Sequence, residues 1–296
     1  DRVLDQLGPA VRAGRSLFVY GPPGNGKTVI SQCIRNLLRG EIAVPYALDV
    51  DGSIIHFFDP INHEPVTGTG AAGDDDTSLH REYIPDGRWV LCRRPSLTVG
   101  GELTLDALEL NYSPSMGFYR APVQAIANGG VLVIDDFGRQ HCSPRDLLNR
   151  WIVPLESGVD FLGLQTGQKF HLPFVVLVVF ATNLKPAELV DEAFLRRIRY
   201  KVFAESPTRE DFVRIFANYC EAMRVPFDHG VVDRMLREYF RPRGIPLRGC
   251  HPGALIDQAL ALAEYLGQDR ALTSDLLQSA CQSYFVDDRE TPTEYA

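Results

Sequence analysis

The stretch GPPGNGKT, residues 21–28, fits the pattern G-x-x-x-x-G-K-[ST] at every fixed position. A short apolar strand candidate, SLFVY (16–20), precedes it, and a helical pattern, VISQCIRNLL (29–38), follows and ends at Gly40. Glycines let backbone N–H groups curve around phosphate oxygens, and the N-terminus of the following helix adds positive potential. A chance glycine-rich turn is the alternative, but the flanking strand and helix favour a phosphate-binding loop.

The polar side chains of this loop predict a nucleotide bound together with Mg²⁺. Lys27 is expected to reach the β- and γ-phosphates, and Thr28 to offer its hydroxyl to the metal. The predicted nucleotide-contacting residues are Gly21, Pro22, Pro23, Gly24, Asn25, Gly26, Lys27, Thr28 and Val29.

A second apolar run, VLVI (131–134), ends on two adjacent acids, Asp135 and Asp136. A nucleotide in such a loop needs a second strand that ends in an acid for its metal. Mg²⁺ keeps much of its hydration shell, so Asp135 is predicted to hold it through water. Asp136 is then placed to polarise the water that attacks the terminal phosphate. Two solvated acids at a strand end are the alternative.

The composition narrows the class of protein. The 296 residues carry a formal net charge of −8, which argues against a surface with general affinity for nucleic acid. The six cysteines show neither a CxxC pair nor zinc spacing, so we expect reduced thiols in a cytoplasmic protein. The longest apolar run, FVVLVVFA (174–181), is too short to span a bilayer, so we expect no membrane insertion. The chain starts without Met, and we interpret it as a fragment with room for a further N-terminal domain.

Apolar runs and turns outline a parallel sheet in the first two thirds of the chain. Residues 59–87 are interpreted as a long, partly mobile surface loop, because they are rich in Gly, Asp, Pro and Thr. The expected strands are 16–20, a hairpin within 44–58 around the turn Asp51-Gly52, 88–94, 131–136, 174–182 and, as a fifth, 198–203.

After Pro207, helical patterns follow one another without strands. Thr208 and Thr273 are predicted as N-caps. The four expected helices cover 208–223, 231–240, 252–266 and 274–285. We therefore predict an α/β domain over residues 1–205, with an insertion around 50–120, and a helical domain over residues 206–296.

These features occur in the order found in the AAA+ ATPases, which the chain resembles over nearly its whole length. The further shared motifs are a strand ending ATN (181–183) and the arginine pair in DEAFLRRI (191–198). The resemblance implies an α/β P-loop fold: a parallel five-stranded sheet flanked by helices, β-hairpin insertions and a small all-α C-terminal lid. It also implies ATP or ADP with Mg²⁺ as cofactors, and a ring with active sites shared between neighbours, with a hexamer as the favoured size.

Two stretches resemble the MoxR-like branch, which has an insert at helix 2 and includes poorly described bacterial ATPases. They are VQAIANGGVLVIDD (123–136) and the LE-x-G-V … LP … ATN sequence within 153–183. In the second stretch the turn Gln165-Thr166-Gly167 separates two alternating segments, which predicts a hairpin.

The resemblance assigns roles to residues outside the loop. Asn183 would be the sensor that orients the lytic water, the alternative being a cap for the turn before Lys185-Pro186. Arg197 would be the arginine finger that reaches into the neighbouring subunit's site. Arg196 is the next candidate, and a solvated basic turn is the alternative for both.

The sequence departs from the superfamily at two positions. An Asp-Glu pair is usual at the strand end, and Asp136 is one methylene shorter than Glu. The lid arginine called sensor 2 is replaced by Gly253. Arg248 is the predicted substitute in nucleotide binding, and Arg243 is a weaker option.

Three functions remain open at this point. The first is an oligomeric Mg²⁺-dependent ATPase motor that remodels an unidentified protein partner. Phe118, Tyr119 and Arg120 would grip that partner, or the two aromatic residues pack as core. The second is a nucleic-acid motor or loader, and the third is a slow nucleotide-gated scaffold subunit.

Overall fold

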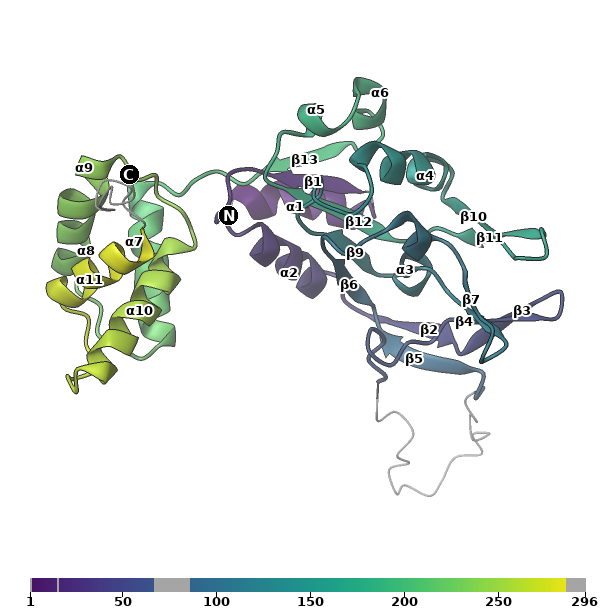
Figure 1. Ribbon diagram of the computed structural model, residues 1–296, viewed down its shortest axis with the longest axis horizontal. Helices are drawn as coiled ribbons and strands as arrows, with labels where there is room; N and C mark the ends of the chain where they lie inside the picture. Colours follow the sequence, from purple (N-terminus) through teal and green to yellow (C-terminus); the bar gives the residue numbers. More distant parts are fainter. Residues whose placement is uncertain (1, 15, 67–85, 286–296) are drawn as a thin grey trace, which may run out of the picture. The chain divides into compact units, whose positions relative to one another are not determined.

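The computed structural model describes residues 2–14, 16–66 and 86–285, and the chain divides into two compact units (Figure 1). The first consists of Asp1–Gly21 and Lys27–Phe203, and the second of Pro22–Gly26 and Ala204–Ala296. A short piece of the predicted phosphate-binding loop therefore belongs to the same unit as the C-terminal residues.

The first unit is built on the predicted parallel five-stranded sheet. In order across the sheet, its strands are β13 (Tyr200–Phe203), β1 (Leu17–Tyr20), β12 (Leu177–Thr182), β9 (Val131–Ile134) and β6 (Ser96–Val99). Every neighbouring pair runs parallel, so the carboxyl ends of the strands meet at one edge.

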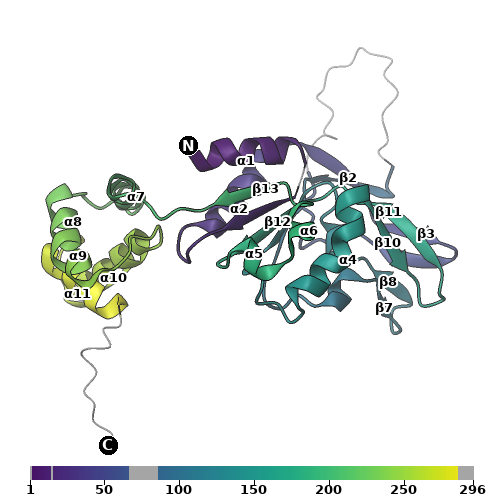
Figure 2. The same cartoon turned by 90° about the horizontal axis from the view of Figure 1, so that it is seen from above.

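Helices cover both faces of this sheet (Figure 2). Trp151, from α4 (Pro144–Ser157), packs in the cluster on one face. Ile34, from α2 (Lys27–Leu37), packs on the other face beside residues of α1 (Arg2–Arg12). Because side chains alternate between two buried faces, the central strands are continuous apolar runs.

The edge of the sheet differs from what the sequence predicts. The strand candidate at 88–94 forms β5 (Trp89–Arg93), which pairs antiparallel with β2 (Glu41–Pro45) in a separate two-stranded sheet. The edge position belongs to β6, which was not anticipated. Its sequence, SLTV, places a polar residue at every second position, so it lacks the continuous apolar signal of a strand buried on both faces.

Two β-hairpin insertions confirm the predicted turns. Asp51 and Gly52 have φ of 49° and 78°, as a two-residue type I′ turn requires. The first hairpin pairs β3 (Ala47–Val50) with β4 (Ser53–His56), and the second pairs β10 (Val159–Gly163) with β11 (Lys169–Pro173). Strands β8 (Phe118–Arg120) and β7 (Asn111–Ser113) extend the first hairpin into a sheet of order β3-β4-β8-β7.

Tyr119 is part of the core and does not grip a partner from an open loop. Its side chain is 5% exposed, and its hydroxyl accepts a hydrogen bond from the backbone N–H of Gln165 at 3.0 Å. Phe118 is half-buried and packs beside His56, with ring centroids 5.4 Å apart. The structure thus favours core packing, one of the two alternatives that the sequence left open.

Short helices connect these strands. They are η1 (Leu105–Leu108), α3 (Val123–Ile126), α5 (Pro186–Leu189) and α6 (Glu192–Leu195). Of the loop predicted over residues 59–87, the part from 67 to 85 lies outside the described residues.

The second unit contains the predicted helices. Thr208 and Thr273 are their N-caps, because their side chains accept hydrogen bonds from the backbone N–H groups of Asp211 and Leu276. The helical segments are α7 (Arg209–Ala222), α8 (His229–Met235), the π-helical turn η2 (Leu236–Phe240), α9 (Arg241–Arg243), α10 (His251–Tyr265) and α11 (Ser274–Tyr284). No helix in the described part of the chain is long and apolar enough to cross a membrane.

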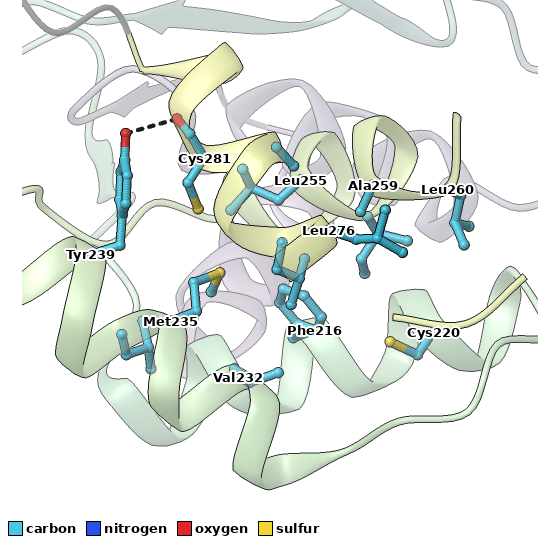
Figure 3. Close-up of a cluster of buried hydrophobic side chains, with 14 of the residues drawn as sticks. Phe216, Cys220, Val232, Met235, Tyr239, Leu255, Ala259, Leu260, Leu276 and Cys281 are labelled. Atoms are coloured by element: carbon cyan, nitrogen blue, oxygen red, sulfur yellow. Dashed lines mark hydrogen bonds between the residues drawn. The ribbon is translucent and has the colours of Figure 1, made fainter. Parts of the chain in front are cut away.

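These helices enclose a hydrophobic core of their own (Figure 3). Phe216 and Leu255 are fully buried in it. The hydroxyl of Tyr239 donates a hydrogen bond to the carbonyl of Cys281 at 3.0 Å. Burial raises the pKa of the Cys281 thiol to about 12, so this cysteine is a neutral packing residue.

Candidate nucleotide-binding site

In the first unit, the two predicted metal ligands lie side by side. Lys27, near the end of the predicted loop, is the first residue of α2, and its ammonium donates a hydrogen bond to the carbonyl of Gly21 at 3.0 Å. The hydroxyl of Thr28 donates to Asp135 Oδ2 at 3.3 Å. Strands β1 and β9 flank β12 in the parallel sheet, so their carboxyl ends bring these residues to the same edge.

The second acid, Asp136, is held in an unusual backbone conformation. Its φ is 47°, a region that few residues other than glycine adopt. Its backbone N–H donates to Asp135 Oδ1 at 3.0 Å, and the amide of Asn183 donates to Asp136 Oδ1 at 3.0 Å. The structure therefore joins Asn183 to the acid pair, in agreement with a role for all three at one site.

One supporting residue, Gln140, was not predicted from the sequence. Its side-chain amide donates to the backbone carbonyls of Asp135 at 3.0 Å and Asp136 at 3.3 Å. Its side-chain oxygen accepts from the N–H of Gly138 at 2.8 Å. Gln140 thereby fixes the turn that carries both acids, and only its position shortly after the Asp-Asp pair in the sequence hinted at this.

The two neighbouring arginines lie in different environments. Arg197 forms an ion pair with Glu156 of α4, and its side chain is 29% exposed. Arg196 pairs with Glu192 one helical turn away and is 75% exposed. The structure thus distinguishes two residues that sequence spacing left equivalent.

The turn carrying this pair is fixed by Lys201. Its ammonium donates to the carbonyls of Leu195 at 2.8 Å and Ile198 at 2.7 Å, on either side of the two arginines. Burial lowers the pKa of Lys201. The backbone that carries Arg196 and Arg197 is therefore held at both ends, although the side chains extend from an exposed turn.

In the second unit, the segment Pro22–Gly26 is held by the residues that follow the sheet domain. The amide of Asn25 donates to Ser206 Oγ at 3.1 Å, and the guanidinium of Arg248 donates to the carbonyl of Pro23 at 3.0 Å. Arg243, the weaker substitute for sensor 2, instead lies over the ring of Tyr239, 4.1 Å from its centroid.

Gly253 packs closely against a tyrosine ring. A Cβ at this position would lie 2.8 Å from Cε1 of Tyr219 on α7. A side chain at position 253 would therefore require the partly exposed Tyr219 ring to move.

The donor set of the first unit fits a nucleotide with Mg²⁺. A hydroxyl and a carboxylate in contact, Thr28 and Asp135, are hard oxygen ligands of the kind Mg²⁺ prefers. Among the described residues, no three His, Cys, Asp or Glu side chains form a metal-binding group. A cation here would complete its shell with water and phosphate oxygens, as is usual for Mg²⁺. Val29, predicted to contact the nucleotide, is 58% exposed on α2.

Solved structures with a similar fold include a RuvB variant from Thermotoga maritima, with a TM-score of 0.56 and 14% identity over 97% of this chain and 71% of that one. NtrX from Brucella abortus in complex with ATP gives a TM-score of 0.54 and 15% identity, covering 98% of this chain and 58% of NtrX. The chain has the AAA+ P-loop fold. At these identities the likeness concerns the fold alone, and this chain spans little more than half of NtrX.

Sequence comparisons add one match. Residues 208–283, within the second unit, match a family described as "Domain of unknown function (DUF8689)". No protein of the curated collection matches the sequence. The comparisons therefore describe the fold of the chain, an α/β P-loop fold with a C-terminal helical region.

Proposed function

We propose that this chain is an ATPase that binds ATP with Mg²⁺ and hydrolyses it to ADP and phosphate. The observation that supports this best is a series of hydrogen bonds that connects the predicted metal ligands to Asn183. Thr28 contacts Asp135, the backbone of Asp136 binds the Asp135 carboxylate, and Asn183 binds the Asp136 carboxylate. The NtrX structures in complex with ATP and with ADP show that a similar fold binds these nucleotides.

The loop and the first acid bind the nucleotide. Backbone N–H groups of the loop, which Pro22 and Pro23 lack, would surround the phosphates, and Lys27 would exchange its bond to the Gly21 carbonyl for phosphate oxygens. Thr28 and Asp135 would hold Mg²⁺, with Asp135 acting through water. When bound, Mg²⁺ neutralises charge that develops on the phosphates.

The second acid and its partner act on water. Asp136 polarises the attacking water, and Asn183 orients both the Asp136 carboxylate and that water. Arg197 acts in a neighbouring subunit's site, where it neutralises charge in the transition state. To do so it must leave Glu156, its partner within the chain.

Turnover and binding of purified chain test this proposal. We expect Mg²⁺-dependent release of phosphate from ATP, and at least a tenfold weaker nucleotide affinity in Lys27→Ala. The matched control is Lys185→Ala, because Lys185 is exposed and lies outside the loop. Wild-type chain that binds neither ATP nor ADP would contradict the proposal.

We further propose that a ring of these chains uses the energy of ATP hydrolysis to remodel a protein partner, as in the MoxR-like branch. The position of hairpin β10–β11 directly before β12 supports this assignment. At the β7–β8 turn, Met116 is 57% exposed and is a better contact than the buried Tyr119. We expect Met116→Asp to reduce partner-stimulated turnover and leave basal turnover unchanged. Stimulation by DNA that falls with added salt would instead indicate a nucleic-acid motor.

A slow, nucleotide-gated scaffold is the second candidate. The observation that favours it is the φ of 47° at Asp136 together with the Asn183 bond, since both restrict movement of an already short acid toward water. Oligomer mass that rises with ATP while phosphate release stays near background would favour the scaffold.

A further inference from the structure

The segment Pro22–Gly26 is attached to the helical residues through its backbone. Arg248 Nη1 donates to the carbonyl of Pro23 at 3.0 Å, and the backbone N–H of Cys250 donates to the carbonyl of Gly24 at 2.8 Å. The two acceptors are the carbonyls of consecutive residues in the phosphate-binding loop. All of these residues belong to the second unit, so the contacts lie within one compact body.

Gly24 packs closely against the side chains of Cys250 and Arg248. A Cβ on Gly24 would lie 2.5 Å from Cys250 Sγ and 3.4 Å from Arg248 Cδ. Gly24 also has φ of 79°, which glycine adopts readily. Two donated hydrogen bonds and a tight steric fit thus fix the same peptide units.

A third contact fixes the next residue of the loop. The side-chain amide of Asn25 donates to Ser206 Oγ at 3.1 Å and to the carbonyl of Ala204 at 3.5 Å. Pro23, Gly24 and Asn25 are therefore each bound by a residue at or after position 204.

The geometry points to Arg248 as a positioning residue: it holds the phosphate-binding loop by a main-chain carbonyl, in place of a sensor 2 arginine that contacts phosphate. This inference rests on the proposed function. It adds a means by which the helical domain would affect nucleotide binding. The usual sensor 2 position is occupied by Gly253, which packs closely against the Tyr219 ring and supplies no side chain to the nucleotide. Because Arg248 contacts the loop and not the nucleotide, it should affect the affinity for every nucleotide that the loop binds, with or without a γ-phosphate.

The test compares affinities for ADP and for a non-hydrolysable ATP analogue, measured by calorimetry on the full chain. Arg248→Met removes the donor but keeps an apolar stem, and we expect it to weaken both nucleotides by the same factor, about three- to tenfold. Arg248→Lys keeps a donor and should restore most of the affinity. Arg241→Met is the matched control, because Arg241 is an exposed arginine of the same unit.

Two outcomes would overturn the inference. Loss of affinity for the ATP analogue with ADP unchanged would show a contact with the γ-phosphate. Wild-type affinity for both nucleotides in Arg248→Met would show no role for the residue. Either result leaves the proposed ATPase standing, whereas failure of the wild-type chain to bind nucleotide would contradict that proposal first.

A double-mutant cycle tests the contact without changing Arg248. Gly24→Ala should weaken both nucleotides, because its Cβ meets Cys250 Sγ and its φ is unfavourable. Adding Cys250→Ala removes the sulfur, so part of the loss should be recovered. Strictly additive effects of the two substitutions would mean that residues 24 and 250 do not pack together, and would also overturn the inference.

Discussion

The side-chain amide of Asn183, which follows β12, donates a 3.0 Å hydrogen bond to the carboxylate of Asp136, which follows β9. The two strands are neighbours in the parallel sheet, so their ends place both residues at one edge. A carboxylate one methylene shorter than Glu is thereby held in a fixed direction. Its reach is smaller, but its orientation is set by the protein before any water binds.

Removing the charge of Asp136 should stop chemistry without stopping binding. We expect Asp136→Asn to lower kcat by at least about 100-fold, because a neutral amide cannot accept a proton from water. Affinity for ATP should change by less than a factor of about three, since Asp135 and Lys27 remain. Phosphate release and calorimetry measure the two effects. A variant with normal kcat would show that Asp136 is not the group that polarises water.

Asn183 and Asp136 should behave as one unit. We expect Asn183→Ala to lower kcat about tenfold or more in the wild-type background, and to have little further effect when Asp136 is already Asn. The four rates of this double-mutant cycle measure the coupling. Equal effects of Asn183→Ala in both backgrounds would mean that the hydrogen bond does not contribute to turnover.

The two neighbouring arginines should differ in kinetics. Arg197→Ala is expected to reduce turnover by about 10³-fold or more if the residue neutralises transition-state charge in the next subunit. Arg196→Ala is the matched control and should change turnover little, because Arg196 is 75% exposed and pairs only across one helical turn in the described structure. Mixing Arg197→Ala chains with Lys27→Ala chains should restore part of the activity. No recovery in mixed assemblies would argue against sites shared between subunits.

The ion pair between Arg150 of α4 and the buried Asp160 of β10 should contribute to the stability of the first unit. Arg150 on α4 forms hydrogen bonds with Asp160 at 2.7 Å and Glu109 at 2.5 Å, and the Asp160 side chain is only 4% exposed. We expect Arg150→Met to lower the free energy of unfolding by about 3 kcal/mol, because it leaves Asp160 buried without a cation. Denaturant unfolding followed by circular dichroism measures it.

Two further variants control this result. Arg145→Met makes the same change at an exposed position of the same helix and should cost less than about 0.5 kcal/mol. Adding Asp160→Asn to Arg150→Met should recover part of the loss, since the buried charge is then removed. Equal stability of Arg150→Met and Arg145→Met would contradict the expected role of the pair.

The helical domain should lose stability in mild acid. Burial, and secondarily the charge of Arg248, lower the pKa of His251 from 6.5 to about 4. The folded chain therefore prefers the neutral imidazole, and between these pH values the unfolded chain binds more protons. Stability is fully present above pH 6.5 and falls as the pH drops toward 4, by up to about 3 kcal/mol.

Unfolding at a series of pH values measures this dependence. His251→Leu should flatten it, because the ring lies among Phe240, Tyr284 and Phe285 and an apolar side chain suits that site. His141→Gln, at an exposed histidine of the first unit, serves as the control and should leave it unchanged. The same pH profile in wild type and His251→Leu would refute the assignment.

The sheet and its acids could be predicted because their causes are local. Strands buried on two faces are continuous apolar runs, and a loop of this pattern between a strand and a helix is specific for phosphate binding. The role of Gly130, just before β9, is by contrast not local: a Cβ there would lie 2.0 Å from the carbonyl oxygen of Pro95, so the glycine permits close approach of the chain beside β6.

What escaped prediction depends on contacts distant in sequence. The edge strand β6 has a weak apolar pattern, and only its pairing with β9 identifies it. Gln140 carries no motif, since its role is to bind two main-chain carbonyls. The bond from Arg248 to Pro23 joins residues 225 positions apart, and no spacing rule relates them.

The membership of Pro22–Gly26 in the second unit changes what a truncated chain would retain. A chain ending at Phe203 would keep all five strands, Lys27, Thr28 and both aspartates. It would lack the partners described for Pro23, Gly24 and Asn25, which lie at residue 204 and beyond. Separating the chain at residue 203 would therefore leave the loop covalently intact in the first fragment, while the residues that hold its backbone would be in the second fragment.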